Sequence, residues 1–168
     1  DLVSQLIISV FLIFGIYQFY FWCQRNTLGR PREFRTAVDD AIPYRPGWVW
    51  IYSCLYYPVI VYINFVMVSP AHFLHVAMSY VILLAAQMVF FTTVPVAVPV
   101  AWRAYNQRRD ASERLLALVQ SFDDRSNSFP SMHVSVATLT TLHLLPQLGG
   151  WAWLFPVLIA VSCQIGRA

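Results

Sequence analysis

The residues best suited to chemistry lie where a polar stretch leads into an apolar segment, and they read Asn-Ser-Phe-Pro-Ser-Met-His at 127–133. Ser131 is a typical helix N-cap, and Pro130 ends the loop before it. The free backbone N–H groups and the dipole at such a helix start favour an anion. His133, one turn inside, could give a proton to an oxygen that leaves this anion. The stretch therefore predicts an anion site with an acid beside it.

His133 also has a purely structural explanation. A histidine inside a membrane helix can serve only as a hydrogen-bonding contact between neighbouring helices. Ionisable side chains within membrane spans are functional by default, because burying them in the bilayer is costly. The residues alone therefore leave packing and catalysis as alternatives for His133.

The elements that must position this stretch are membrane spans. Of the 168 residues, 58% are hydrophobic and only 11% are charged, so a water-soluble fold would lack polar surface. Apolar runs of about 20 residues alternate with short polar stretches, which predicts an all-α, polytopic transmembrane bundle. The five visible spans are expected at 2–22, 48–68, 73–94, 131–148 and 151–166.

The span count places the polar parts of the chain on two opposite faces. Loops 24–47 and 101–130, which hold ten of the eleven arginines, lie on the same face as His133 and Arg167. The positive-inside rule would make this face cytoplasmic. If these arginines bind an anionic substrate, however, their number on this face would be the same whichever side of the membrane it lies on. The short turn 69–72 lies on the opposite face.

Residues 104–122 in the second loop predict an amphipathic helix lying on the membrane surface. The second span is expected to begin in an interfacial aromatic belt. The apolar face of the helix consists of Leu115, Leu118, Val119 and Phe122. The aromatic belt of the second span consists of Trp48, Trp50, Tyr52, Tyr56 and Tyr57.

Other candidate residues fit structural roles better. His143 lies ten residues after His133 on the same expected helix, which is about 15 Å of rise, so the two cannot share a site. His72 and His75 have a spacing that would suit a metal but have no carboxylate nearby, and their interfacial position accounts for them. Asp39 and Asp40 are expected in a solvated turn. Neither a metal nor a cofactor is predicted.

Pro130 to His133 resembles the second signature, Pro-Ser-Gly-His, of the type 2 phosphatidic acid phosphatase superfamily. The wider stretch 127–133 is similar to a branch that includes inositol phosphorylceramide synthases. The resemblance implies one domain over residues 1–168 with five spans of an expected six, about the number such bundles have. Because the chain starts at Asp1 without Met, we expect it to be incomplete at the N-terminus as well as the C-terminus.

The other two signatures of the family are matched by topological position. Gly166-Arg167 falls where the third signature, Ser-Arg-x5-His-x3-Asp, would begin, so its His and Asp are expected beyond Ala168. The first signature, Lys-x6-Arg-Pro, cannot occur because the chain has no lysine. Arg103, at the exit of the third span, is its expected counterpart, although Ala104 stands where the family has proline.

The resemblance implies phosphoryl transfer through a phosphohistidine. The histidine beyond Ala168 would attack phosphorus while Arg103 and Arg167 hold the phosphoryl oxygens. Ser131 would add a hydroxyl or a helix-start N–H, and Met132 replaces the glycine of the signature. His133 would protonate the departing alkoxide.

Three functions follow from this interpretation. The first is a lipid-phosphate phosphatase, in which water resolves the phosphohistidine, and the second is a phosphotransferase that passes the phosphoryl headgroup to a lipid or alcohol. The third is a non-catalytic membrane scaffold derived from such an enzyme, which the absent lysine and the altered Met132 motivate. The expected partners are a lipid phosphate and membrane lipids, with no nucleic acid. The family resemblance favours an extracytoplasmic or luminal active-site face.

Overall fold

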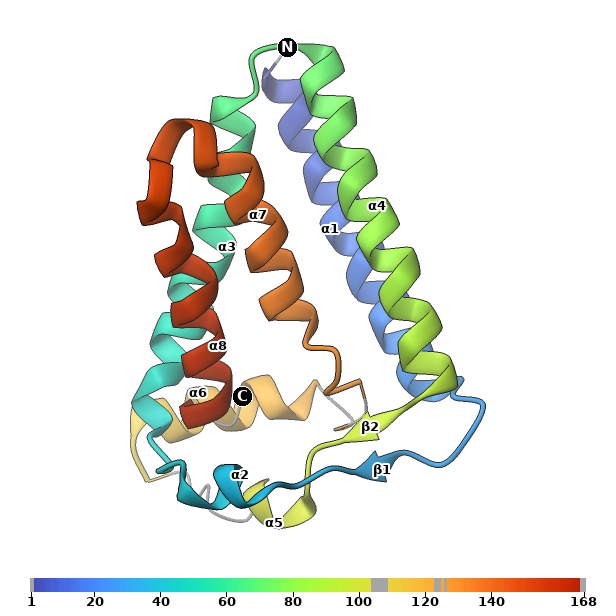
Figure 1. The fold of residues 1–168 in the computed structure, drawn as a ribbon, viewed down its shortest axis with the longest axis vertical. Helices are drawn as coiled ribbons and strands as arrows, with labels where there is room; N and C mark the ends of the chain where they lie inside the picture. Colours follow the sequence, from blue (N-terminus) through green and yellow to red (C-terminus); the bar gives the residue numbers. More distant parts are fainter. Residues whose placement is uncertain (1, 104–108, 123–124, 126, 167–168) are drawn as a thin grey trace.

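The structure is a computed structural model that describes residues 2–103, 109–122, 125 and 127–166, and it confirms the all-α prediction. The long helices form a bundle in Figure 1, and a layer of loops and short elements closes one end. The bundle helices are α1 (Leu2–Arg25), α3 (Val49–Val66), α4 (Pro70–Thr93), α7 (Met132–Leu148) and α8 (Leu154–Gly166).

Four stretches have the length and hydropathy to cross a membrane, as an integral membrane protein requires: Leu2–Arg25, Pro46–Val66, Pro70–Thr93 and Met132–Gly166. The last is folded as a hairpin of α7 and α8, joined by the 3-10 helix η2 (Gly149–Trp153). The start predicted for the fifth span was wrong, because Trp151 lies in η2. Thr141 Oγ1 donates to Ala152 O at 3.1 Å and ties η2 to α7.

The turn predicted at 69–72 was also wrong in extent, because α4 already begins at Pro70. Ser69 caps this helix, since its Oγ accepts a hydrogen bond from the His72 N–H at 3.1 Å. Proline at the first helical position costs no hydrogen bond, and its fixed φ suits the helix. The end predicted for the third span, at residue 94, agrees with the structure to within one residue, as α4 ends at Thr93, before Pro95.

The bundle core consists of two clusters of buried side chains, and the larger one reaches the loop layer. One cluster of buried side chains joins all five helices there, and a smaller cluster lies toward the other end. The first consists of Cys23, Tyr56, Phe91, Met132, Val136, Ala137, Phe155 and Ile159, and the second of Ile63, Val76, Leu144 and Ala152. The first turn of α7 is therefore held by side chains from every other helix of the bundle.

The polar loops contain short elements that the sequence did not predict. Strands β1 (Arg32–Glu33) and β2 (Val96–Ala97) pair in parallel, and η1 (Pro46–Trp48) leads directly into α3. Thr36 and Asp39 form a capping box at the start of α2 (Ala37–Ala41). A further short helix, α5 (Val100–Arg103), follows β2.

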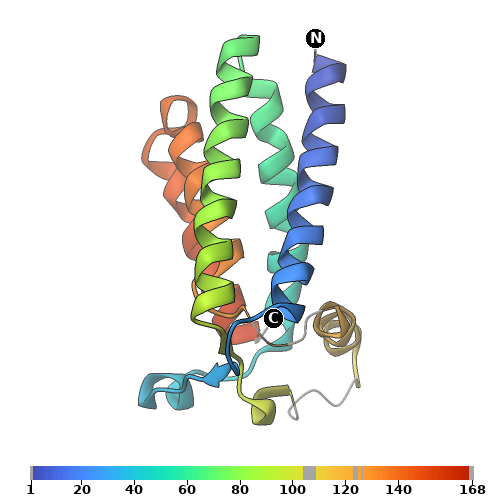
Figure 2. The same cartoon turned by 90° about the vertical axis from the view of Figure 1, so that its right-hand side faces the viewer.

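The amphipathic helix predicted in the second loop is confirmed as α6 (Ala111–Ser121), while residues 104–108 of that prediction lie outside the described part of the chain. Asp110 caps α6 by accepting the Glu113 N–H at 2.8 Å. In Figure 2 this helix is seen nearly end-on, so its axis runs across the end of the bundle. It packs on η1 and α3, and Trp50 Nε1 donates to Ser112 Oγ at 3.1 Å.

Candidate active site

The start of α7 has the geometry expected from its sequence. Ser131 is the N-cap, and its Oγ accepts the Val134 N–H at 3.4 Å. The Met132 side chain is buried in the core cluster and anchors the first turn. The N–H groups of this turn therefore lie at the edge of the loop layer, where a helix start favours an anion.

His133 is held between two tyrosines of α3. Its Nε2 lies 2.6 Å from the hydroxyl of Tyr52, and its ring centroid is 4.7 Å from that of Tyr52 and 4.8 Å from that of Tyr56. The tautomer decides which partner donates the Tyr52–His133 hydrogen bond. Sequence reasoning assigned both tyrosines to the interfacial belt and missed this contact. Their spacing of one helical turn was the available signal, because it puts both rings on one face of α3.

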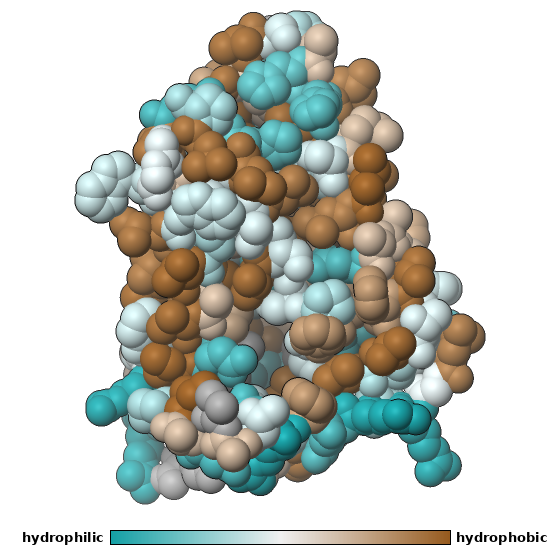
Figure 3. All heavy atoms as spheres, viewed as in Figure 1, coloured by the Kyte–Doolittle hydropathy of each residue, from teal (hydrophilic) through white to brown (hydrophobic). Residues whose placement is uncertain are grey.

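A cavity of about 500 Å³ lies beside His133, between the bundle and α6. Figure 3 shows the surface hollowed above the polar loop layer. The polar groups in the lining come from segments far apart in the sequence. They are Tyr17, Tyr20, Tyr52, Ser53, Tyr57, Arg103, Gln120, Asn127, Ser128, Ser131, His133, Cys163 and Gln164.

Arg103, at the end of α5, reaches the same cavity as His133. Its Nη1 donates to Gln120 O on α6 at 3.1 Å, and the side chain is half-buried. Gln120 also lines the cavity. The sequence put Arg103 on this face from the span count alone, and the structure brings it together with Ser131, Met132 and His133 in one lining.

The segment before α7 is fixed by hydrogen bonds to β2 and the residues after it. Ser128 gives both its backbone N–H and its Oγ to Val96 O, at 3.0 and 2.7 Å. The Val98 N–H donates to Arg125 O at 2.9 Å, and Arg125 forms an ion pair with Glu33 at 3.5 Å. The loops that precede α3, α5 and α7 are thus joined into one support for the cavity.

Comparison with known protein families matches residues 27–165 to the PAP2 superfamily. The chain belongs to the PAP2 superfamily. The match covers Arg103 and the whole stretch 127–133, so the expected membership is confirmed. Members of this superfamily are phosphatases and phosphotransferases, which makes a phosphate-bearing group the general class of substrate. Searches of curated proteins and of solved structures each found no match.

The end of α8 brings the PAP2 chain back to the loop layer. Arg45 N–H donates to Ile165 O at 2.9 Å, and Gly166 lies so close to η1 that an added Cβ would be 3.6 Å from Trp48 Cβ. Cys163 and Gln164, on the last turn of α8, line the cavity. Arg167, the second predicted phosphate-binding arginine, lies outside the described residues.

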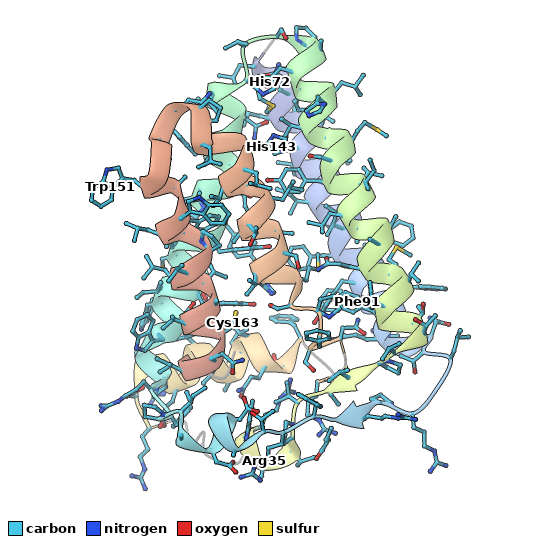
Figure 4. All side chains as sticks on the ribbon, viewed as in Figure 1. Arg35, His72, Phe91, His143, Trp151 and Cys163 are labelled. Atoms are coloured by element: carbon cyan, nitrogen blue, oxygen red, sulfur yellow. The ribbon has the colours of Figure 1, made fainter. Side chains whose placement is uncertain are left out.

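The remaining histidines of this PAP2 protein lie away from the cavity. Figure 4 shows His72 and His143 toward the end of the bundle opposite the loop layer, with Cys163 near the loop layer. His143 Nε2 lies 2.8 Å from Ser79 Oγ, and its ring is 6.0 Å from that of His75. The prediction that His143 cannot share a site with His133 is confirmed, because it lines neither of the two main cavities.

The aspartates of the first loop have structural partners. Asp39 Oδ2 accepts hydrogen bonds from the backbone N–H and the hydroxyl of Thr36, both at 2.7 Å. Asp40 forms an ion pair with Arg35. Neither carboxylate lines the 500 Å³ cavity. Both therefore organise the turn, as the sequence favoured.

Taken together, the cavity offers groups suited to an oxyanion. Arg103 supplies a guanidinium, the α7 start supplies backbone N–H groups, and His133 can carry a proton. Tyr52 restrains the imidazole from the side of α3. A group held by these residues would meet positive charge, hydrogen-bond donors and one acid within a single space.

Proposed function

We propose that this protein is a lipid-phosphate phosphatase that binds a phosphoryl group in the 500 Å³ cavity and cleaves it through a phosphohistidine. One observation carries the proposal: Arg103, at the end of α5, and Ser131 and His133, at the start of α7, line the same cavity. The PAP2 membership supports a phosphatase-type reaction, and the spans support a substrate that resides in the bilayer.

The nucleophile is proposed to be the histidine of the third signature, expected after Arg167. The chain has four histidines, and His133 is the one that lines the cavity. If His133 acts as the acid, another histidine must attack phosphorus. The last turn of α8 borders the cavity, so the residues that follow it would enter from the same side.

In the first step, the nucleophilic imidazole forms an N–P bond while the bond between phosphorus and the lipid oxygen breaks. His133 donates its proton to the departing alkoxide, which leaves as an alcohol. In the second step, His133 takes a proton from water, and the resulting hydroxide displaces the histidine to give inorganic phosphate. Arg103, Arg167 and the N–H groups at Ser131 and Met132 stabilise the phosphoryl oxygens in both steps.

A second, apolar cavity supports a lipid substrate. It has a volume of about 80 Å³ and lies among α1, α3, α4 and α7. Tyr17, Tyr57 and Met132 line both cavities, so the two spaces are neighbours across these side chains. A hydrocarbon chain directed into the bundle would leave the polar cavity at this point and contact apolar side chains.

A phosphotransferase similar to the inositol phosphorylceramide synthase branch is the second candidate. The size of the polar cavity favours it, because about 500 Å³ lies within the range of sites that hold whole small molecules, roughly 300–1,000 Å³. Such a cavity has room for an alcohol acceptor beside the phosphoryl group. The stretch 127–133 supports this branch by its resemblance alone.

The active-site face is proposed to be extracytoplasmic or luminal. Three of the ten arginines in its loops have roles that do not depend on the positive-inside rule: Arg103 lines the cavity, Arg35 pairs with Asp40 and Arg125 pairs with Glu33. Attaching a glycosylation acceptor to the loop between α5 and α6 tests this placement. We expect a glycan to be added at this acceptor. The placement would be contradicted if this acceptor stayed unmodified and an acceptor inserted between α3 and α4 were glycosylated.

The enzymatic proposal is tested with the full-length protein in lipid nanodiscs. Phosphate release from a panel of lipid phosphates should be detectable. Quenching with alkaline detergent after a labelled substrate is added should trap phosphate on a histidine, because the N–P bond is stable in base and hydrolyses in acid. Adding alcohols separates the two candidates, since a phosphotransferase forms a phosphorylated alcohol in place of free phosphate. A protein that releases no phosphate, transfers none and traps none would be a non-catalytic scaffold.

A further inference from the structure

Asn127 has a hydrogen-bond acceptor that nothing in the described part of the chain satisfies. Its side chain is 3% exposed and lines the 500 Å³ cavity. Nδ2 donates to Tyr20 O on α1 at 3.2 Å, whereas Oδ1 is buried without a hydrogen-bond partner. Buried polar atoms are rarely left in this state, and each such case requires an explanation.

The orientation of this amide is fixed by its partner. Only the NH2 group can donate to the carbonyl of Tyr20, so Oδ1 must be the free atom. Asn127 has φ 68°, a left-handed conformation that asparagine adopts more readily than most residues. Next to it, Ser128 is held by two hydrogen bonds to Val96 O. The Asn127 side chain is therefore held in place in the lining of the cavity.

The chemistry of Oδ1 identifies the kind of group that would satisfy it. An amide oxygen accepts a hydrogen bond and repels the oxygens of a phosphate dianion, so it is unsuited to the phosphate cradle. A hydroxyl group donates such a bond and carries no charge. We propose that Asn127 Oδ1 binds an alcohol hydroxyl on the part of the substrate, or of the acceptor, next to the phosphoryl group.

This inference rests on the proposed function, because the phosphoryl group would bring the hydroxyl into the cavity. It adds a substrate class: phosphates attached to, or transferred to, a polyol. Asn127 is a specificity-determining residue in this account, and His133 and Arg103 handle the phosphoryl group. A site built to bind a hydroxyl discriminates against an analogue without one, because its buried polar atom is left unpaired.

The test compares two soluble phosphates of equal charge and chain length, glycerol 1-phosphate and propyl phosphate. Binding is measured by calorimetry on the full-length protein carrying His133→Ala, which should slow turnover by about 10²- to 10⁴-fold. We expect glycerol 1-phosphate to bind about tenfold more tightly, the gain from one well-placed hydrogen bond. Asn127→Leu should abolish this preference and leave the affinity for propyl phosphate within about threefold.

Gln87→Leu is the matched control. Gln87 on α4 is also 3% exposed with an unpartnered amide nitrogen, but it does not line the cavity, so the preference should persist in this variant. Equal binding of the two phosphates by the otherwise unchanged protein would overturn the assignment, as would a preference that survives Asn127→Leu. The comparison of the two phosphates in the protein that keeps Asn127 does not depend on whether Asn127→Leu folds. Binding of neither phosphate would instead overturn the phosphate site of the proposed function.

Discussion

The two ends of α7 each hold a histidine that is hydrogen-bonded to a hydroxyl on another helix. His133 pairs with Tyr52 at 2.6 Å, and His143 pairs with Ser79 at 2.8 Å. By hydrogen bonding alone the two residues are alike. Their surroundings differ: His133 borders a cavity of about 500 Å³, and His143 packs near His75 and Tyr80.

The difference lies in charge and space. Arg103 reaches the cavity beside His133. The partners of His143 come from the segment 46–102, and neither this segment nor the segment 126–166 that holds His143 contains an arginine. A proton donor is useful for phosphoryl transfer only where the phosphate can also be held. Under the proposed function, the adjoining cavity and cation are what distinguish His133 from His143, since both histidines have the packing contact.

Replacing each histidine in turn should give the largest contrast. His133→Ala removes the proposed acid and should lower phosphate release from a lipid phosphate by about 10²- to 10⁴-fold. His143→Ala should retain most of the activity. Initial rates in nanodiscs, with thermal unfolding as a check of the fold, measure both variants. Similar losses in the two variants would remove the distinction between the two ends.

Arg103 should show the next largest effect. Arg103→Ala removes one guanidinium from the cavity, and kcat/KM should fall by about 10²- to 10³-fold. Arg103→Lys should recover only part of this loss, because an ammonium cannot bind two phosphoryl oxygens as a planar fork does. Arg35→Ala is the control, since Arg35 pairs with Asp40 away from the cavity. Full activity in Arg103→Ala would exclude Arg103 from the phosphate site.

Tyr52→Phe sharpens the comparison at the hydroxyl partners. It removes the hydroxyl that restrains His133 but keeps the aromatic contact at 4.7 Å. Loss of one such hydrogen bond should lower kcat by about tenfold. The matched variant Ser79→Ala, which removes the partner of His143, should not change kcat. If both variants were equally impaired, the hydroxyls would matter for packing alone.

Thr141→Val should have the smallest effect, and only on stability. It removes the hydrogen bond to Ala152 O at 3.1 Å, which ties η2 to α7. The free energy of unfolding should fall by about 1 kcal/mol, as for one buried hydrogen bond between membrane helices. Denaturant unfolding in detergent measures it, with activity assayed in parallel. A loss of activity without a loss of stability would link the far end of the bundle to the site.

Much of the fold could be predicted because the membrane imposes it. Apolar runs of spanning length, the Ser131 cap and the breaks at Pro95 and Gly149 are local signals, and the structure has helices ending where they indicate. The errors were local as well. Ser69-Pro70 is a helix start that was assigned to a turn, and Trp151 was assigned to a helix that begins only at Leu154.

The candidate site was predictable only where a motif or the span count applied. His133 and Ser131 follow from the stretch 127–133, and Arg103 follows from topology. The contact of Tyr52 with His133 joins residues 81 apart in the sequence, so no local pattern contains it. Oδ1 of Asn127 is left as a free acceptor because Nδ2 of the same amide donates to Tyr20 O, and tertiary packing decides that contact.

The central claim, that His133 protonates the leaving oxygen, is tested most directly by varying the leaving group. Phosphate release is compared for an alkyl phosphate lipid and for an aryl phosphate, whose phenolate leaves without needing a proton. The account predicts that His133→Ala lowers kcat/KM for the alkyl substrate by about 10²-fold or more and for the aryl substrate by much less. An equal loss for the two substrates would contradict it, because the role of His133 would then not depend on the leaving group.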